Sequence, residues 1–357
     1  MTVEVGFAGV IGVPSTSVRD FYSAHWKRKI ALSNRRFYEW QFIEPPENLN
    51  VDSCVVAVRD GQLLGVMGLN KRTFYLAQKA YNGAELTTWI VDHDVKGQGV
   101  GAKILNFITN HFDVLIGMGI SADALPVYML NGFRFLHAIP RFVKVIDIEA
   151  LAKVAEISEI ALKLARNWQT DPMQISSEQI VWREQGSLKI LQGNHFARDV
   201  SHLAWRYDDH PFFEYKSFRV KSSESEGSYI YVVLREEVTE DVRILHVLDI
   251  LGNESEFPVA LRFAADYAAK HSFWAVDMFS TYSKLNGYLL ASGWFSTLDD
   301  TSLKVPHLYC PLEIRTPATT SLIYRASPKF AAMCDVANLY ITKQDADLDR
   351  PTNLSTG

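Results

Sequence analysis

Apolar positions along the first half of the chain recur at the spacings of short strands and helices. Residues 53–69 predict two strands of a hairpin, because Asp60-Gly61 is a turn signal between two apolar runs. The other elements predicted in this half are a strand over 85–91, a helix over 101–112 with one apolar face, a strand over 114–121, and a short helix followed by a strand over 124–136.

The second half of the chain repeats this pattern in the same order. It predicts strands over 229–236 and 243–251, a helix over 257–271, a strand over 273–280, and a short helix followed by a strand over 283–296. Because the order and the element types match, we interpret the chain as an internal duplication.

Aromatic and glycine landmarks support the duplication. Trp40 in YEWQF corresponds to Trp205 in LAWRY, and Gly132 before Phe133 corresponds to Gly293 before Trp294. The interval from the tryptophan to the glycine is 92 residues in the first half and 88 residues in the second. The two halves therefore have nearly the same length between matching points.

We predict an α/β protein with two tandem domains, each a mixed, mostly antiparallel sheet flanked by helices. The first domain spans 1–148, a linking helix spans 149–170, and the second domain spans 171–330. A polar tail over 331–357 follows. From Asp345 onward we expect this tail to run over the surface.

Composition and charge narrow the class of protein. The chain has 357 residues and a net charge of −5, without the basic excess of a nucleic-acid-binding protein. No apolar run approaches the length of a membrane span. Cys54, Cys310 and Cys334 lack the close spacing of a zinc site or a disulfide framework. We expect a cytoplasmic protein with no metal and with neither nucleic acid nor membrane as a partner.

A glycine-rich segment, KGQGVGA over 96–102, stands between a predicted strand and a predicted helix. Backbone N–H groups at a helix start are unpaired and bind phosphate, and glycine lets the ligand approach. The Walker pattern is absent. The dinucleotide fingerprint matches at Gly97, Gly99 and Ala102, but five residues separate it from the preceding strand. A third kind of phosphate loop fits better.

The segment VDHDVKGQGVGA resembles the acyl-CoA loop of the GNAT superfamily of N-acyltransferases, in which Arg/Gln-x-x-Gly-x-Gly/Ala follows a strand. Lys96 stands at the usual Arg or Gln position. The family's second motif, a tyrosine shortly before Gly-Phe, appears as Tyr128 ahead of Gly132 and Phe133. The resemblance covers about residues 1–148. It departs from the family where Ser121 replaces an asparagine that often contacts pantetheine.

The second half keeps the layout but lacks the chemistry of the family. Its loop reads GNESEFP, without alternating glycines and with two glutamates that repel a pyrophosphate. Leu289 stands at the position of Tyr128. The resemblance therefore implies two tandem GNAT-like domains, of which the second is a degenerate copy that forms the acceptor wall.

The resemblance implies that acyl-CoA is the co-substrate of an N-acyltransferase. The glycine loop then holds the CoA pyrophosphate, the strand ending at residue 91 lies along pantetheine, and Tyr128 protonates the departing thiolate. The cofactor-binding residues implied in this way are Trp89, Ile90, Val91, Lys96, Gly97, Gln98, Gly99, Val100, Gly101 and Ser121.

An acceptor amine arrives as ammonium and must lose a proton to a base. We rank Glu85 and His25 first as this base. A water chain is a further alternative, and other candidates are Asp92, His93, Asp94 and His137.

Aromatic and basic residues mark a candidate acceptor site. Rings stack on bases and arginine pairs with phosphate, so Trp40, Trp205, Arg206 and Tyr207 suit a nucleotide-linked sugar. The layout also resembles two-domain GNAT proteins that acylate amino sugars such as dTDP-3-amino-3,6-dideoxygalactose, with acetyl or 3-hydroxybutanoyl as the acyl group. Two alternatives stay open: an acyltransferase acting on a peptide, antibiotic or aminoacyl group, and a non-catalytic acyl-CoA sensor. Family habit favours a homodimer.

Overall fold

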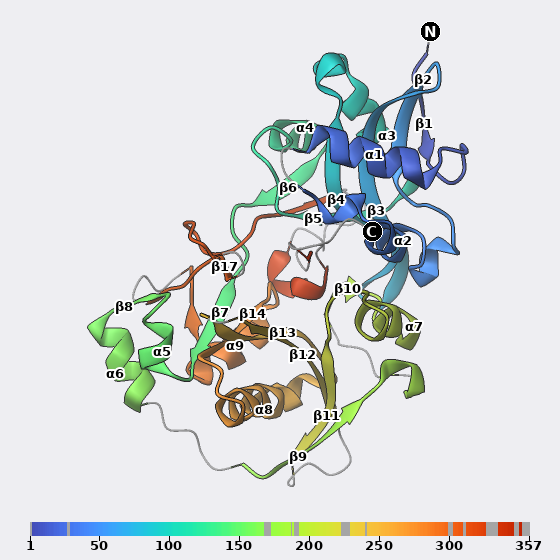
Figure 1. Cartoon of the computed structure of the whole chain (residues 1–357). Helices are drawn as coiled ribbons and strands as arrows, with labels where there is room; N and C mark the ends of the chain where they lie inside the picture. The colour runs from blue at the N-terminus through green and yellow to red at the C-terminus, as the bar shows by residue number, and fades with distance from the viewer. Residues whose placement is uncertain are drawn as a thin grey trace.

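The computed structural model describes residues 2–26, 29–167, 173–186, 188, 193–222, 229–239, 241–298, 303–309, 312–325, 335–345 and 350–351. Within them, an eight-stranded and a seven-stranded sheet form the two lobes of Figure 1. Each large sheet has a single parallel strand pair and is otherwise antiparallel. This confirms the predicted α/β class with mixed, mostly antiparallel sheets.

The first sheet has the order β1-β2-β3-β4-β5-β19-β6, and β10 pairs with the far part of β3. Helices α1 and α2 cover one face and α3 the other, where Ile104, Leu105 and Ile108 are buried as the helical pattern predicts. The bounds are β1 Glu4–Phe7, α1 Ser15–His25, α2 Arg35–Phe42, β2 Val55–Arg59, β3 Gln62–Leu76, β4 Lys79–Val91, α3 Val100–His111, β5 Val114–Met118, α4 Leu125–Leu130, β6 Phe133–Leu136, β10 His195–Phe196 and β19 Leu322–Arg325.

The second sheet has the order β15-β7-β14-β13-β12-β11-β9, and α8 and α9 pack on it through one large apolar core. The bounds are β7 Arg141–Val145, β9 Ile175–Ile180, β11 Lys216–Ser222, β12 Ile230–Val238, β13 Arg243–Leu251, α8 Phe257–Lys270, β14 Ala275–Phe279, α9 Ser283–Ala291 and β15 Phe295–Ser296. In both lobes a parallel strand pair is joined by a helix, β4-α3-β5 and β13-α8-β14, which matches the predicted duplication.

Each large sheet includes at least one strand from the other half of the chain, and β10 in the first sheet is such a strand. β7 leaves the first lobe and lies between β14 and β15 of the second sheet. β19 returns from the C-terminal part of the chain and lies between β5 and β6 of the first sheet. Neither sheet is therefore formed by one continuous stretch of chain, and the domain boundary proposed at residue 148 does not coincide with the boundary between the sheets.

The segment 149–170 does not form the single linking helix expected from its sequence. Its described part breaks into α5 Ile148–Leu151, β8 Glu156–Ile157 and α6 Glu159–Asn167. The reason is local pairing: β8 forms a two-stranded sheet with β16, Leu303–Lys304. The side chain of Ser158 then caps the next helix by accepting from the N–H of Ala161 at 3.2 Å. A second small sheet joins β17, Leu308–Tyr309, to β18, Leu312–Glu313.

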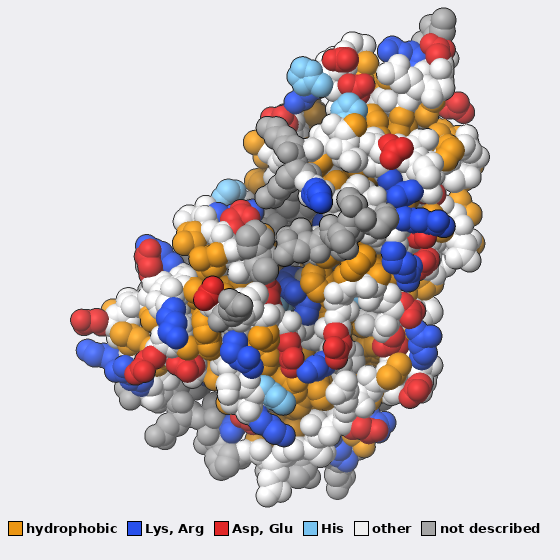
Figure 2. All heavy atoms as spheres, in the orientation of Figure 1, with side chains coloured by type: hydrophobic (Ala, Val, Ile, Leu, Met, Phe, Trp, Pro, Cys, Tyr) orange, Lys and Arg blue, Asp and Glu red, His pale blue; other side chains and the backbone are white. Residues whose placement is uncertain are grey.

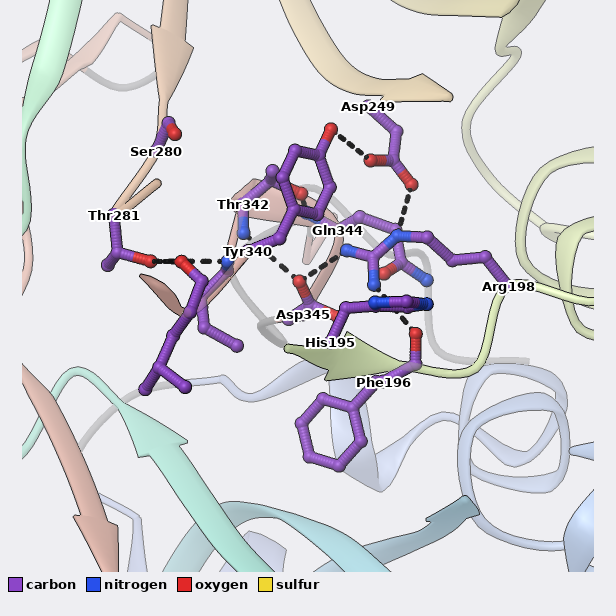
Figure 3. Close-up of polar contacts among 12 residues, drawn as sticks. His195, Phe196, Arg198, Asp249, Ser280, Thr281, Tyr340, Thr342, Gln344 and Asp345 are labelled. Carbon is purple, nitrogen blue, oxygen red and sulfur yellow. Dashed lines mark hydrogen bonds and ion pairs between the residues drawn. The ribbon is translucent and has the colours of Figure 1, made fainter. Parts of the chain in front are cut away.

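The C-terminal segment 339–345 is buried between the lobes rather than spread over the surface (Figures 1 and 3). Leu339 and Ile341 pack in an apolar cluster with residues of the first sheet, whereas Tyr340 packs in the core of the second. Asp345, where the surface tail was expected to begin, has no exposed surface. Most of the tail beyond it, including residues 346–349, lies outside the described residues.

Charged groups fix this segment to both lobes. Asp345 accepts from Arg72 of β3 at 3.0 Å and from Arg198 at 2.6 Å. Arg198 also pairs with Asp249 of β13 at 2.8 Å, as Figure 3 shows. A buried carboxylate is stable only when it is paired, so one aspartate holds both Arg72 of β3 and Arg198, which is itself paired with the second sheet.

None of the described helices is long and apolar enough to cross a membrane. On the face drawn in Figure 2, acidic and basic side chains are interspersed rather than gathered by sign.

Candidate active site

Strands β4 and β5 diverge near the middle of the first sheet. Their last paired residues are Leu86 and Gly117, yet β4 continues to Val91. Among the described residues, the backbone of 87–91 therefore has no ladder partner on the side of β5. One carbonyl of this stretch, that of Thr88, accepts from the hydroxyl of Tyr22 of α1 at 3.2 Å. A peptide-like ligand can hydrogen-bond to the open edge of β4 at this divergence.

The glycine loop follows directly on this open strand. A short 3-10 turn, His93–Val95, leads to Gly97 and Gly99, whose φ angles are +84° and +81°. In α3 the first intrahelical bond runs from the N–H of Lys103 to the carbonyl of Gly99 at 3.0 Å. The N–H groups of residues 100–102 thus precede the helical ladder and point out of the helix start. Such a terminus attracts an anion.

The three glycines have different reasons to be glycine. At Gly97 and Gly99 an added Cβ meets nothing within 4 Å, so only the positive φ opposes a larger residue. At Gly101 an added Cβ lies 2.8 Å from Cζ2 of Trp89. Gly101 is therefore required by the packing of Trp89 beneath α3, whereas the first two glycines shape the loop and leave its surface open.

Polar side chains on both sides of the loop have local partners. The ammonium of Lys96 contacts a carboxylate oxygen of Asp123 at 2.8 Å, which connects the loop to the approach to α4. Gln98 donates to the carbonyl of Asp94 at 3.1 Å. The hydroxyl of Ser121 accepts from the N–H of Ala124 at 3.3 Å and so serves first as a cap.

Tyr128 projects from α4 into the first lobe and is almost fully buried. Its ring forms edge contacts with Trp89 and Phe133 at centroid distances of 5.2 and 5.0 Å. Its hydroxyl points at the sulfur of Met67 on β3, 3.8 Å away. Burial raises the pKa of Tyr128 well above its ordinary value. The hydroxyl therefore keeps its proton at neutral pH, as an acid must.

A pocket between the lobes opens on the α2 face of the same sheet. We call it the interlobe pocket; its cavity volume is about 20 Å³, within a hollow of roughly 340 Å³ that includes open solvent. The first lobe lines it with Phe37, Trp40, Gln41, Asn70, Arg72 and Glu85. The second lobe and the C-terminal segment line it with His202, Trp205, Arg206 and Gln344.

Several buried polar atoms of the interlobe pocket have no hydrogen-bond partner among the described residues. They are Gln41 Oε1, Asn70 Oδ1, Arg72 Nε, His202 Nδ1 and Gln344 Oε1. A buried polar atom without a partner costs free energy, on the order of 1–3 kcal/mol. Five such atoms around one hollow indicate that a polar ligand or ordered water completes the site.

Glu85 lies in this pocket and His25 does not. Glu85 on β4 is opposite Asn70 on β3, and its carboxylate is 3.8 Å from Nη1 of Arg72. His25 lies at the end of α1 with its ring against Phe21 at 4.2 Å. Of the two bases ranked first from sequence, Glu85 is the one with access to an acceptor in the pocket.

The other base candidates lie elsewhere. Asp92 caps the following turn by accepting from the N–H of Asp94 at 3.0 Å. His93 and Asp94 have 93% of their side-chain surface exposed, and His137 is also exposed.

Three of the four acceptor residues predicted from sequence line the interlobe pocket, and one does not. Trp40, Trp205 and Arg206 line the interlobe pocket, and a π-helical turn over Ala204–Asp208 sets the direction of the last two. The guanidinium of Arg206 donates to the hydroxyl of Tyr215 at 2.9 Å. Tyr207 points into the second-lobe core with its ring 5.1 Å from that of Tyr215 and does not line the pocket.

Sequence reasoning missed His202, Gln344, Arg72, Asn70 and Gln41. None belongs to a motif, and the pocket unites them from α2, β3, α7 (Val200–Leu203) and the C-terminal segment. The unexpected burial of residues 339–345 is what adds Gln344 to the set.

The second sheet diverges in the corresponding place, but the protein's own chain occupies that divergence. β13 and β14 are last paired at Val247 and Met278. Beyond that point the hydroxyl of Tyr340 accepts from the N–H of Ile250 at 3.0 Å. On the other side the N–H of Thr281 donates to the carbonyl of Ile341 at 3.1 Å. In the part of the chain that the structure describes, the second unit therefore has no open edge for a cofactor at this position.

Comparisons with known proteins agree with this geometry. Residues 17–123 match the model of the acetyltransferase (GNAT) family, a span that includes β4, the glycine loop and α3. A search of curated proteins found no match.

Solved structures share the fold of most of the chain. A conserved protein from Enterococcus faecalis V583, described as a probable N-acyltransferase, is 11% identical with a TM-score of 0.54, over 91% of this chain and 73% of its own. A GCN5-related N-acetyltransferase from Anabaena variabilis ATCC 29413 is 10% identical with a TM-score of 0.50, over 91% and 72%. The family match together with this shared fold supports an acyl-CoA-dependent N-acyltransferase.

Proposed function

We propose that the protein transfers an acyl group from acyl-CoA to an amine, with CoA along the open edge of β4 and the amine in the interlobe pocket. One observation carries the proposal: β4 belongs to both places. Its residue Glu85 lines the pocket, and residues 87–91 form the open edge that leads into the glycine loop. Thr88 is about 10 Å from Glu85 along the strand, at roughly 3.3 Å per residue.

The chain offers each group that cofactor binding requires. The N–H groups of residues 100–102 and the open loop at Gly97 and Gly99 suit a pyrophosphate. The edge of residues 87–91, which no described strand pairs on the side of β5, suits the amides of pantetheine. When bound, acyl-CoA supplies the activated thioester.

The reaction needs one base and one acid. Glu85, directly or through water, takes a proton from the ammonium, and the free amine attacks the thioester carbonyl. An N–H of the open edge hydrogen-bonds to the developing oxyanion. The C–N bond forms, the C–S bond breaks, and Tyr128 gives its proton to the thiolate. The second proton lost by the nitrogen returns to Tyr128 through solvent, which leaves an amide and free CoA.

We further propose a nucleotide-linked amino sugar, such as dTDP-3-amino-3,6-dideoxygalactose, as acceptor, with acetyl or 3-hydroxybutanoyl as the acyl group. The support is the lining of the interlobe pocket, whose unpartnered amide and imidazole atoms suit hydroxyl groups. A peptide or antibiotic amine is the alternative acceptor. The sensor alternative is less favoured, because a buried tyrosine beside the open strand has the place of an acid.

The test is release of free thiol from acetyl-CoA and 3-hydroxybutanoyl-CoA with dTDP- and UDP-linked amino sugars, a peptide amine and an aminoglycoside. The Tyr128→Phe variant should bind CoA as the wild type does and release thiol at least 100-fold more slowly. Tyr231→Phe, in the second sheet, is the matched control and should keep full activity. CoA binding without thiol release for any amine supports the sensor, and loss of CoA binding itself contradicts the proposal.

A further inference from the structure

We infer that Gln344 of the C-terminal segment and His202 of the second lobe are specificity-determining residues that recognise hydroxyl groups of the acceptor. This inference rests on the proposed function, because it assigns the substrate chemistry of the same pocket. Both side chains are nearly fully buried and both line the interlobe pocket. The amide oxygen of Gln344 has no hydrogen-bond partner among the described residues, and Nδ1 of His202 faces a carboxylate oxygen of Glu47 beyond hydrogen-bond distance, at 3.9 Å.

The two residues form a fixed pair. Nε2 of Gln344 lies 2.8 Å from Nε2 of His202. The amide donates in this contact and the ring nitrogen accepts, so a neutral His202 carries its proton on Nδ1. Burial, followed by the positive charge of Arg72, lowers the pKa of His202 to about 4, which keeps the ring neutral at pH 7. The pair therefore offers one donor, Nδ1–H, and one acceptor, the Gln344 amide oxygen.

The remaining lining extends the same chemistry. Asn70 and Gln41 each offer a buried amide oxygen, and Arg72 offers its Nε–H. A ligand that satisfies all of these atoms must both donate and accept hydrogen bonds at several points. A polyhydroxylated ring does so, because every hydroxyl is donor and acceptor at once. A hydrocarbon of the same size would leave the buried atoms unpaired, which is the strongest form of rejection available to a pocket.

Charge and ring geometry exclude two other groups from this end of the pocket. Arg72 is already neutralised by Asp345 at 3.0 Å and has Glu85 at 3.8 Å, so it is a poor partner for a phosphate. Trp40 and Trp205 stack on each other at 5.0 Å with their planes 19° apart. Their facing surfaces cannot take a nucleobase. The interlobe pocket thus suits hydroxyl groups of the acceptor sugar, and its nucleotide must lie outside.

Gln344 is positioned rigidly enough to discriminate. Its N–H is 3.3 Å from the hydroxyl of Thr342, and the next residue, Asp345, is held by two arginines. Thr342 in turn donates its N–H to Asp345 at 3.0 Å. Ordering this segment before the ligand arrives lowers the entropic cost of recognition.

The experiment compares Gln344→Met, which keeps the volume but removes the amide, with Ile341→Val, a buried change in the same segment away from the pocket. The probes are D-glucosamine, dTDP-3-amino-3,6-dideoxygalactose and cyclohexylamine, each with acetyl-CoA. For Gln344→Met we expect KM for the hydroxylated amines to rise about tenfold, as for the loss of a neutral hydrogen bond. KM for cyclohexylamine should fall, because the variant removes a polar atom that cyclohexylamine leaves unpaired. CoA affinity should stay unchanged, and Ile341→Val should match the wild type throughout.

Calorimetry with the same amines and CoA separates the possible failures. If neither hydroxylated amine binds to or is acylated by the wild type, or if Gln344→Met changes the hydroxylated amines and cyclohexylamine equally, the inference is overturned. An enzyme that acylates only cyclohexylamine or a peptide amine overturns it as well, while leaving the transferase proposal intact. Absence of CoA binding contradicts the proposed function itself.

Discussion

Trp40 and Trp205 are related to each other as the two halves of the chain are. Their rings stack at 5.0 Å, Nε1 of Trp40 donates to the carbonyl of Trp205 at 3.0 Å, and Nε1 of Trp205 donates to the carbonyl of Trp40 at 2.8 Å. The two hydrogen bonds are therefore reciprocal. The two landmarks of the duplicated sequence thus meet at a local two-fold relationship, and the interlobe pocket lies beside them.

Replacing Trp205 with alanine should destabilise the fold strongly, because it removes a buried ring and the hydrogen bond that Nε1 of Trp205 donates to the carbonyl of Trp40. We expect a loss of about 3–5 kcal/mol in the free energy of unfolding, measured with denaturant. Trp26, which is 37% exposed at the end of α1, provides the control: Trp26→Ala should change stability by less than about 0.5 kcal/mol. Equal effects of the two substitutions would contradict the packing described.

The different roles of the glycines lead to a rescue experiment. Gly101→Ala should destabilise by about 1–3 kcal/mol, because its methyl group meets the ring of Trp89, and adding Trp89→Phe should restore part of this loss. Gly97→Ala should cost about 1 kcal/mol through its positive φ, and Trp89→Phe should not restore it. Melting curves of the single and double variants decide between the two patterns.

Asp345→Asn should be among the most destabilising conservative substitutions in the chain. It leaves the buried guanidinium groups of Arg72 and Arg198 with one counter-charge fewer, at a cost of about 3–5 kcal/mol. The exposed pair between Lys304 and Glu156 is the matched control, and Lys304→Gln should cost less than about 1 kcal/mol. Urea titrations would contradict the prediction if the two variants unfolded at the same midpoint.

Stability should fall on mild acidification through His195. Burial, followed by the charge of Arg198, lowers the pKa of His195 to about 4, against about 6.5 in the unfolded chain. Between these values the unfolded state binds the extra proton. The stability contributed by neutral His195 is therefore complete above about pH 6.5 and is lost as the pH falls toward 4, at up to about 1.4 kcal/mol per pH unit. His195→Asn should reduce this slope by one proton in unfolding curves recorded from pH 7 to 4.5.

Glu85→Gln tests the base directly. If the carboxylate takes the proton of the acceptor, kcat should fall about 100-fold or more, and CoA affinity should not change. His25→Gln is the control, because His25 does not line the interlobe pocket, and this variant should retain most activity. The reverse result would move the base to α1.

Local features were predictable from the sequence, whereas contacts across the lobes were not. The loop 96–102, α3 and Tyr128 were found because their residues are neighbours in the chain and follow helical or strand spacing. Gln344 and His202 are 142 residues apart, and no periodicity relates them. The predicted linking helix was wrong because, within the described part of residues 149–170, β8 pairs with β16 instead of continuing a helix. The polar residues around Asp345 predicted an exposed tail, whereas Asp345 is buried in ion pairs with two arginines.

The positions of β7 and β19 in the two sheets determine when each sheet can be completed during synthesis. While the chain emerges from the ribosome, the gap between β5 and β6 stays empty until residues 322–325 have been made, although the glycine loop appeared more than 200 residues earlier. A chain that terminates before β19 therefore leaves β5 and β6 as unpaired edges of an incomplete sheet. Chaperones and proteases recognise such edges.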